Sequence, residues 1–406
     1  NHLRYPEAHP HSPWSMLELK RTPETNIFDM IREKDLLIHL PYESFDESVV
    51  NFLYSAANDK DVLAIKQTLY RVSSSSPVVQ ALEKAVQNGK QVTVLMEVKA
   101  RFDEANNILM ARRLEKAGAH VIYGLVGLKT HSKCTLVIRR EKDGIRRYVH
   151  VATGNYNAST AKLYTDLGIL TCNDRFGIDA SAFFNLLSGY SDPPIWDSFI
   201  VAPINLRQRC IELIDREIHF AKNGEDAHMI AKMNSLLDKG IIEKLYEASQ
   251  AGVKIELIVR GICVLIPGIP GVSDNITVRS IVGRFLEHSR IFWFRNGGRE
   301  ELYISSADWM PRNLNDRVEL MVPIEDPEIK RRLKQMVDIE LSDNQKAHIM
   351  QADGTWLKTI SAENQLCAQE YFQKIAEKRD AEDEMTLAQK LEPYTCLLYT
   401  SPSPRD

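Results

Sequence analysis

Two histidines occupy equivalent positions in the two halves of the chain, and each stands two residues before a cation. The triplets are His131-Ser132-Lys133 and His288-Ser289-Arg290. A neutral imidazole is a good nucleophile toward phosphorus, and the phosphoramidate that it forms can pass the phosphoryl group on reversibly. A neighbouring Lys or Arg neutralises charge on the transferring oxygens. The repeated pattern therefore indicates phosphoryl transfer, although a single histidine is more often structural than catalytic.

The triplets belong to an internal repeat of helix, turn, strand and terminal arginine. The predicted units are Ala81–Asn88, Val92–Met96 and Arg101 in the first half, and Leu245–Gln250, Ile255–Val259 and Arg260 in the second. Each triplet then opens a predicted strand, Cys134–Arg139 or Ile291–Phe294, and a small polar loop follows. Two such units imply an α/β fold of two tandem lobes related by a pseudo-twofold axis, with both histidines facing one cleft.

The composition narrows the class of protein. With 406 residues, 44% apolar and 26% charged, the chain is typical of a soluble globular protein of two to three domains. No apolar stretch is long enough to span a membrane, and no Gly-rich phosphate loop of the GxxxxGK[ST] type is present. The six cysteines form no CxxC pair, which argues against a zinc site or a disulfide framework and fits a cytoplasmic protein.

The charges are unevenly distributed. The net charge is −4, yet residues 60–175 hold 19 Lys and Arg against 10 Asp and Glu, whereas residues 325–406 hold 11 against 16. A basic block in a mildly acidic chain indicates an anionic partner such as nucleic acid, a nucleotide or a phosphate polymer. A solvated basic face explains the charge count equally well.

A His-x-Lys triplet in a duplicated α/β lobe resembles the phospholipase D superfamily, whose signature is His-x-Lys-x4-Asp. In this chain the Asp position is Ile138 after His131 and Arg295 after His288. Neither copy therefore carries the carboxylate that would orient its imidazole. This departure argues against a phosphodiesterase or nuclease of the standard kind.

The sequence resembles the polyphosphate kinase family more closely, from about residue 27 to about residue 342. The matching phrases include Asp61–Lys66, Leu69–Val72, Ala100–Glu104, Gly127–Lys133, Thr153–Asn157, Leu163–Asp166, Leu257–Gly261, Ser273–Ile276, Leu286–His288 and Ser305–Met310. So many phrases in one order make the resemblance specific. It implies two phospholipase D-like lobes and an ATP:polyphosphate phosphotransferase that works through phosphohistidine, with ATP as substrate and Mg²⁺ as cofactor.

The resemblance also implies roles for single residues. His131 would be the phosphorylated nucleophile, and His288 would contact the nucleotide and assist proton transfer or charge stabilisation. Arg71 and Arg101 stand at the family's magnesium–phosphate site; since an arginine cannot ligate a cation, we interpret both as clamps on phosphate oxygens that the metal bridges.

Four further residues are expected around the nucleotide. Tyr164 and Arg260 match family nucleotide-binding positions, although the pattern around Tyr164 alone suits an ordinary strand. Lys133 and Arg290 are expected to contact phosphate. The nearest carboxylates by pattern, Asp166 and Asp308, could orient a histidine or bind Mg²⁺.

The expected domain organisation is a first lobe at 26–198 and a second at 199–392 with C-terminal helices. Residues 1–25 are interpreted as the remnant of a preceding head domain, and 393–406 as a non-native tail. The resemblance implies a homo-oligomer for the full-length protein and no nucleic-acid partner. It allows peripheral membrane association, which no amphipathic segment of the sequence supports.

Two alternatives to the phosphotransferase stay open at this point. One is a phospholipase D-like hydrolase of a phosphodiester, which the missing Asp at positions 138 and 295 argues against. The other is a non-catalytic module that binds polyanions.

Overall fold

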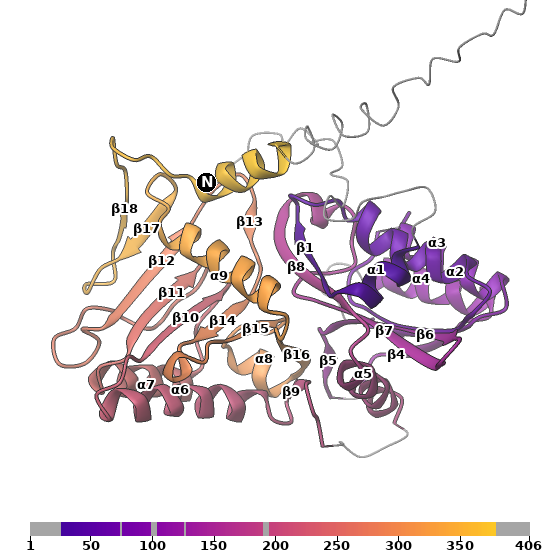
Figure 1. The fold of residues 1–406 in the computed structure, drawn as a ribbon, viewed down its shortest axis with the longest axis horizontal. Coiled ribbons are helices and arrows are strands. Elements are labelled where there is room, and N and C mark those ends of the chain that lie inside the picture. The colour runs from indigo at the N-terminus through magenta and orange to yellow at the C-terminus, as the bar shows by residue number, and fades with distance from the viewer. Residues whose placement is uncertain (1–25, 74, 99–103, 126, 190–194, 379–406) are drawn as a thin grey trace, which may run out of the picture.

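The computed structural model describes residues 26–73, 75–98, 104–125, 127–189 and 195–378, which form two lobes side by side (Figure 1). Each lobe is a β-sheet with helices packed on both faces. The predicted remnant at 1–25, the predicted tail at 393–406 and Arg101 lie outside the described residues. The predicted class, α/β with two tandem lobes, is confirmed.

The sheet of the first lobe has the strand order β4-β3-β2-β6-β7-β8-β1. Its strands are β1 (Leu36–Leu40), β2 (Val62–Leu69), β3 (Gln91–Met96), β4 (His120–Tyr123), β6 (Lys133–Glu141), β7 (Gly144–Ala152) and β8 (Tyr164–Thr171). One face is covered by α1 (Ile27–Glu33), the π-turn η1 (Asp46–Val50), α2 (Asn51–Asn58), α3 (Pro77–Gln87) and α4 (Glu104–Ala117). Helix α5 (Asp174–Leu187) covers the other face, and a short 3₁₀ turn, η2 (Thr160–Lys162), precedes β8.

The sheet of the second lobe has the order β18-β17-β12-β11-β10-β14-β15-β16, with β9 beside β16. Its strands are β9 (Ile200–Ala202), β10 (His228–Met233), β11 (Lys254–Val259), β12 (Ile276–Ile281), β14 (Ile291–Phe294), β15 (Glu301–Ser305), β16 (Arg317–Pro323), β17 (Ala347–Met350) and β18 (Trp356–Lys358). Helices α6 (Leu206–Lys222) and α7 (Lys239–Gln250) pack on one face and α9 (Pro327–Leu341) on the other; α8 (Pro311–Asn315) and η3 (Asn296–Gly298) are short.

The predicted repeat is visible in the strand order. In the first lobe β3-β2-β6-β7-β8-β1 follow one another, and in the second β11-β10-β14-β15-β16-β9 do so. The pairing directions agree as well: β2–β3 and β10–β11 are parallel, whereas β2–β6 and β10–β14 are antiparallel. The two lobes are therefore copies of one topology.

Local sequence explains where the repeated helix and strand begin. Helix α3 starts at Pro77, earlier than predicted, because the Ser76 hydroxyl caps it by accepting the N–H of Val79 and proline suits the first helical position. The chain then turns through Gly89, whose φ of +79° favours glycine, into β3. Burial in β3 alternates only from Gln91 to Val94, and the last three residues are all buried, although the strand lies where it was predicted.

Two very short strands cross between the lobes and determine where the histidines lie. Strand β5 (Lys129–Thr130), just before His131, pairs in parallel with β16 of the second lobe. Strand β13 (Leu286–Glu287), just before His288, pairs in parallel with β8 of the first lobe. Each histidine is thus carried to the sheet of the opposite lobe.

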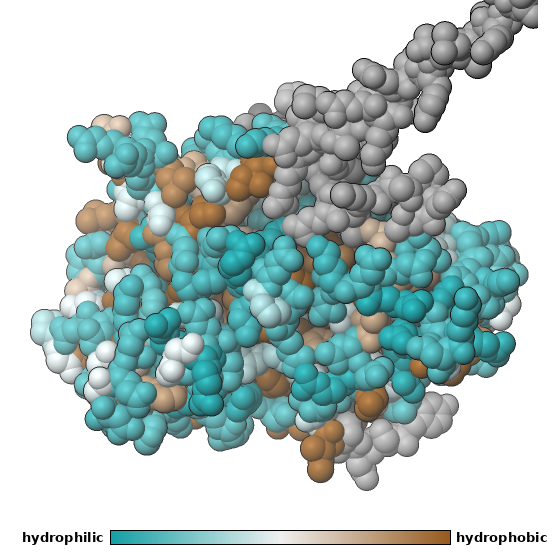
Figure 2. Space-filling model, viewed as in Figure 1, coloured by the Kyte–Doolittle hydropathy of each residue, from teal (hydrophilic) through white to brown (hydrophobic). Residues whose placement is uncertain are grey.

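A shared hydrophobic core fixes the two lobes together. Phe183 and Phe184 of α5, in the first lobe, belong to one buried cluster with Leu320 of β16 and Leu333 of α9, in the second. On the face seen in Figure 2 the surface is mainly hydrophilic, with scattered hydrophobic side chains. Among the described helices, none has the length and apolarity needed to cross a bilayer.

Candidate active site

His131 is held against a carboxylate of the second lobe. The main-chain N–H groups of His131 and Ser132 both donate to the carbonyl of Val318, at 2.9 Å. This places Nδ1 of His131 2.9 Å from each carboxylate oxygen of Glu319. A carboxylate at Nδ1 selects the tautomer with a proton on Nδ1, so the lone pair of Nε2 is available for chemistry.

Glu319 is itself fixed by two further donors. The Ser306 hydroxyl donates to one of its oxygens at 2.5 Å, and the Asn313 amide donates to the other at 2.6 Å. The side chain is fully buried, and burial raises the pKa of Glu319, against the opposing effect of Lys133. Three donors converge on this carboxylate, which stabilises its ionised form.

His288 repeats the arrangement with the lobes exchanged. Its Nδ1 lies 2.8 Å and 3.0 Å from the two oxygens of Asp166 in β8, and the Thr153 hydroxyl donates to Asp166 at 2.6 Å. Burial, the largest effect, would raise the pKa of Asp166, but the interaction with His288 and its hydrogen bonds lower it overall. Each histidine therefore uses a carboxylate from the other lobe.

This arrangement corrects one sequence-based conclusion. Positions 138 and 295 hold no carboxylate, as the sequence shows, but the imidazoles do not lack one, because Glu319 and Asp166 supply it across the lobe boundary. The absent Asp after each triplet therefore does not by itself argue against phosphodiesterase chemistry. The suggestion that Asp166 orients a histidine is confirmed.

Both imidazoles are in a site that favours their neutral form. Burial lowers the pKa of His131 strongly, and the cations Lys133, Arg317 and Arg290 and the second histidine, His288, lower it further. Burial also lowers the pKa of His288, although Asp166 opposes this. A neutral imidazole is the nucleophilic form.

The two triplet cations line the same site. Lys133 is buried and its ammonium donates to the carbonyl of His131; burial lowers its pKa to about 7, with Glu319 opposing. Arg290 donates to the carbonyl of His288 at 2.7 Å. Two parallel contacts of 3.1 Å join its guanidinium to Asp308, so Asp308 orients Arg290 and no histidine.

The expected nucleotide residues surround the His288 side of the site. The Arg260 guanidinium donates to Asn234 at 2.9 Å and 3.1 Å, and the Asn234 amide donates to the carbonyl of His288 at 3.1 Å. The ring centroid of Tyr164 lies 5.2 Å from that of His288. The structure therefore brings both predicted residues to the second histidine.

On the His131 side, Tyr70 joins the predicted residues. Its ring meets the imidazole of His131 edge-on, with centroids 4.8 Å apart. The cations of Arg71 and Lys133 lie 5.8 Å and 5.7 Å from the centroid of the same ring. Arg71 is therefore close to the site, while its predicted partner Arg101 lies outside the described residues.

Sequence reasoning missed Glu319, although the repeat held a signal for it. The first small polar loop begins with Thr153, and the second contains Ser306. In each half an acidic residue lies 13 positions after that hydroxyl residue, at 166 and at 319. Both hydroxyls donate to that carboxylate. Aligning the loops of the two halves would have identified Glu319 as the counterpart of Asp166.

The described side chains do not fit a protein-built Mg²⁺ cage. Among the described residues, no group of three or more His, Cys, Asp or Glu side chains could hold a metal ion. Mg²⁺ prefers carboxylates together with substrate phosphates. The expected magnesium therefore has no ligand set of this kind among the described side chains.

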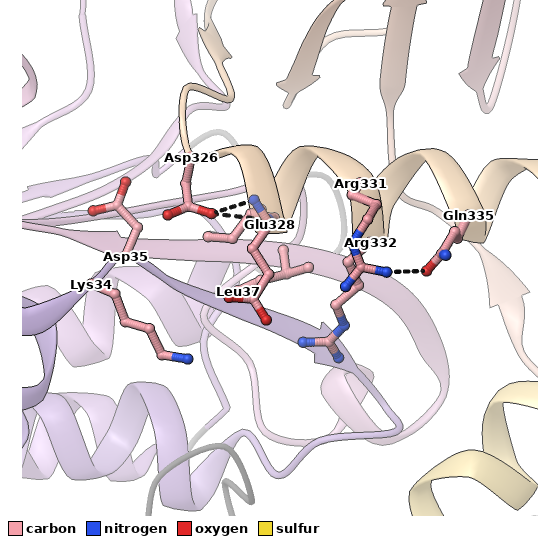
Figure 3. Close-up of a pocket in the computed structure, with 9 residues that line it drawn as sticks. Lys34, Asp35, Leu37, Asp326, Glu328, Arg331, Arg332 and Gln335 are labelled. Carbon is pink, nitrogen blue, oxygen red and sulfur yellow. Dashed lines mark hydrogen bonds between the residues drawn. The ribbon is translucent and has the colours of Figure 1, made fainter.

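A separate pocket lies between α1–β1 and α9 (Figure 3). Its volume is about 200 Å³, and its lining includes Asp35, Asp326 and Arg331. Arg332, which also lines it, pairs with Glu43 at 2.6 Å. None of the predicted site residues lines this pocket, so it is distinct from the histidine site.

Comparisons with known proteins agree with this architecture. The family model described as polyphosphate kinase C-terminal domain 1 matches residues 26–193, and that of polyphosphate kinase C-terminal domain 2 matches residues 199–369. Among curated proteins, the chain is 60% identical to a polyphosphate kinase of Halalkalibacterium halodurans over 80% of this chain and 46% of that protein. It is 55% identical to one of Synechocystis over 87% of this chain and 49% of that protein. The chain spans about half the length of these relatives.

Solved structures give the same grouping. The crystal structure of polyphosphate kinase from Porphyromonas gingivalis matches with a TM-score of 0.85 and 38% identity, over 93% of this chain and 57% of that one. A phosphatidylserine synthase from Haemophilus influenzae matches with a TM-score of 0.52 and 12% identity, over 88% of this chain and 95% of that one, which shows a shared fold alone. The chain belongs to the polyphosphate kinase family.

Proposed function

We propose that this chain is the catalytic part of an ATP:polyphosphate phosphotransferase. In this proposal the γ-phosphoryl group of ATP moves reversibly to inorganic polyphosphate by way of a phosphohistidine at His131. The observation that carries the proposal is the pairing of Nδ1 of His131 with Glu319, because it leaves a neutral, buried Nε2 beside two cations. Family membership supports the substrate class.

The proposed reaction has two displacements at phosphorus. The lone pair of Nε2 forms a bond to the γ-phosphorus while the bond to the bridging oxygen breaks and ADP leaves. The proton on Nδ1 stays hydrogen-bonded to Glu319, whose charge stabilises the imidazolium that forms. A terminal oxygen of polyphosphate then attacks the phosphorus, the N–P bond breaks, and the neutral imidazole returns.

The surrounding cations act on the phosphate oxygens in this proposal. Lys133 and Arg290 neutralise charge on the transferring group, and Arg290 is held in one orientation by Asp308. Arg71 and Arg101 bind oxygens of the magnesium–phosphate substrate. In this proposal Mg²⁺ is bound to ATP as part of the substrate.

His288 serves the nucleotide side. Its Nδ1–H is held by Asp166, so its Nε2 faces the site next to Arg290, at 3.2 Å. We assign to it contact with the nucleotide, in which the neutral Nε2 accepts a hydrogen bond or a proton, and stabilisation of charge on the leaving ADP once Nε2 has been protonated. Tyr164 and Arg260 complete the nucleotide contacts. The homo-oligomer, the membrane association and the cytoplasmic location stay predictions of the family resemblance.

The test is phosphoryl labelling of the protein. The chain is incubated with γ-labelled ATP and Mg²⁺, and the label on the protein is examined for lability in acid and stability in base. We expect such a label in the wild type, its loss in His131→Ala, and its retention in His120→Ala, which changes an exposed histidine.

Other outcomes would select the alternatives. A label that survives His131→Ala removes His131 from its role. No label in any variant, combined with tight binding of polyphosphate, favours the polyanion-binding module. Cleavage of a phosphodiester substrate that depends on His131 favours the hydrolase, which the shared fold and the oriented histidines make chemically accessible.

A further inference from the structure

Three charged side chains form a buried cluster directly behind His288. The ammonium of Lys232 in β10 lies 2.6 Å from a carboxylate oxygen of Glu287 and forms a second ion pair with Glu340 of α9. All three side chains are almost fully buried, with 2% to 4% of each residue exposed. The cluster contacts neither of the two orienting carboxylates, so the proposed reaction does not use it.

The cluster anchors the peptide that carries His288. Glu287 is the last residue of β13, and its carboxylate accepts the Thr165 hydroxyl of β8 at 2.8 Å. The same hydroxyl accepts the main-chain N–H of His288 at 3.2 Å. The next residue of β8 is Asp166, which holds the imidazole. A shift of Glu287 would therefore move His288 relative to its orienting carboxylate.

The charges of the cluster do not balance when every group is ionised. One ammonium faces two carboxylates, which leaves a net charge of −1 in a buried site. An uncompensated buried charge is strongly unfavourable, and the usual outcome is that one group becomes neutral. We therefore expect one of the two glutamates to be protonated, and their hydrogen bonds indicate which one.

The hydrogen bonds distinguish the two glutamates. Glu287 accepts from three donors: Lys232, the Thr165 hydroxyl and the Gln369 amide, the last at 2.6 Å. Glu340 accepts from Lys232 through one oxygen, and its other oxygen is buried with no partner among the described residues. An ionised Glu340 would leave that oxygen unsatisfied, so protonation is less costly there.

The other groups that face Glu340 favour the same assignment. The carboxylate of Asp343, just after α9, accepts four main-chain N–H groups. Tyr42, which follows β1, has a buried hydroxyl without a partner among the described residues. Burial, the largest effect, and Glu287 and Asp343 raise the pKa of Glu340 to about 7, while Lys232 lowers it.

We propose that Glu340 is the protonated carboxyl group of this cluster and that, with Lys232, it is a positioning residue that holds Glu287 in place and His288 in register with Asp166. The role of His288 in this inference rests on the proposed function; the proton on Glu340 does not. When Glu340 loses its proton, two carboxylates compete for one ammonium, and the hold of Lys232 on Glu287 weakens.

The sign of the pH effect follows from the direction of the shift. A carboxyl group whose pKa is higher in the folded than in the unfolded chain stabilises the fold at low pH, and that stabilisation is lost as the pH rises through the folded pKa. We therefore expect the free energy of unfolding to fall between the ordinary pKa of glutamic acid and about pH 7. Glu340→Gln keeps the neutral form and removes this contribution.

The experiment uses infrared titration of the whole chain from about pH 5 to about pH 9, together with urea unfolding over the same range. We expect the carbonyl band of a protonated carboxylic acid near neutral pH in the wild type and in the control Glu363→Gln, which changes an exposed glutamate. We expect Glu340→Gln to lack that band and to lose the matching fall in stability. A band that persists in Glu340→Gln, or its absence from the wild type at pH 6, would overturn the assignment of the proton.

A second readout tests the positioning role without any need for activity. Nitrogen NMR of ¹⁵N-histidine protein, with the His288 signal assigned through His288→Asn, reports the Nδ1–Asp166 hydrogen bond. We expect the His288 signal to change as the wild type passes through about pH 7, and the change to be absent in Glu340→Gln. An identical His288 titration in the two proteins would refute the positioning role even if the proposed phosphoryl transfer were correct.

Discussion

The substitution Glu319→Gln tests the orienting carboxylate of His131 with the smallest change in shape. The amide can still accept the proton of Nδ1, but it has no charge to stabilise the imidazolium. It also brings an N–H group against the donors Ser306 and Asn313, which now share a single acceptor oxygen. The substitution therefore removes charge at Nδ1 and disturbs the group that holds it.

The expected size of the effect follows from the three hydrogen bonds to this buried carboxylate. A hydrogen bond to a charged group contributes about 1.5–3 kcal/mol, and a neutral one about half as much. Of the three, only the bond from Nδ1 gains a charged donor during the transfer, so we expect a barrier that is higher by about 0.8–1.5 kcal/mol, which is a rate about 4 to 13 times lower.

The assay is rapid-quench measurement of the acid-labile label that forms on the protein from γ-labelled ATP. Glu363→Gln serves as the matched control, since it makes the same chemical change at an exposed site. Denaturant unfolding of each variant separates loss of fold from loss of rate. A Glu319→Gln protein that is folded and labelled within about two-fold of the wild-type rate would refute the reasoning.

Three further predictions concern the cation, the close packing and the core. The pKa of Lys133 is lowered to about 7, so its charge is present below that pH and lost above it. In calorimetric titrations the affinity for tripolyphosphate should therefore fall as the pH rises through about 7, and Lys133→Arg should flatten this pH profile. An unchanged profile in the variant would contradict this prediction. At Gly154 a Cβ would lie 2.1 Å from an oxygen of Asp166, so Gly154→Ala should displace that carboxylate. We expect the free energy of unfolding, measured in urea, to fall by about 1–3 kcal/mol and labelling of the protein to slow. A variant with wild-type stability and labelling would show that the contact relaxes freely. Leu333 is fully buried in the core shared by the lobes, so Leu333→Ala should lower the free energy of unfolding by about 2–5 kcal/mol. The control Arg331→Ala, at an exposed position, should lower it by less than about 0.5 kcal/mol in the same assay. Equal effects of the two substitutions would argue against a shared core.

Much of the fold could be predicted because the helices, turns and strands of the repeat are determined by short stretches of sequence. The strand at Ile291–Phe294 was predicted with the bounds that the structure gives, and the strand after His131 extends only slightly beyond its predicted ends. Turn glycines, alternation and helical periodicity are properties of short windows. The pseudo-twofold relation of the lobes followed from the order of these units.

The site could be predicted only in part, because its geometry depends on pairing between the lobes. Nothing in a local window shows that β5 joins β16 or that β13 joins β8. This exchange is what delivers Glu319 to His131 and Asp166 to His288. Reasoning along the chain therefore found both histidines and their cations, but did not find Glu319.

The buried cluster behind His288 shows the same limit. Lys232, Glu287 and Glu340 are separated by 55 and 53 positions in the sequence, and each would be expected on the surface from residue type alone. Only the packing of α9 across the second sheet brings the three together.

The central claim is that Glu319 holds the proton on Nδ1 of His131 and leaves Nε2 to accept the phosphoryl group. The most direct test is ³¹P and ¹H NMR of the phosphoprotein, kept in base, with the modified residue located by mass spectrometry. We predict phosphate on Nε2 of His131. Phosphate on Nδ1 of His131, on His288 or on any other residue would contradict the account.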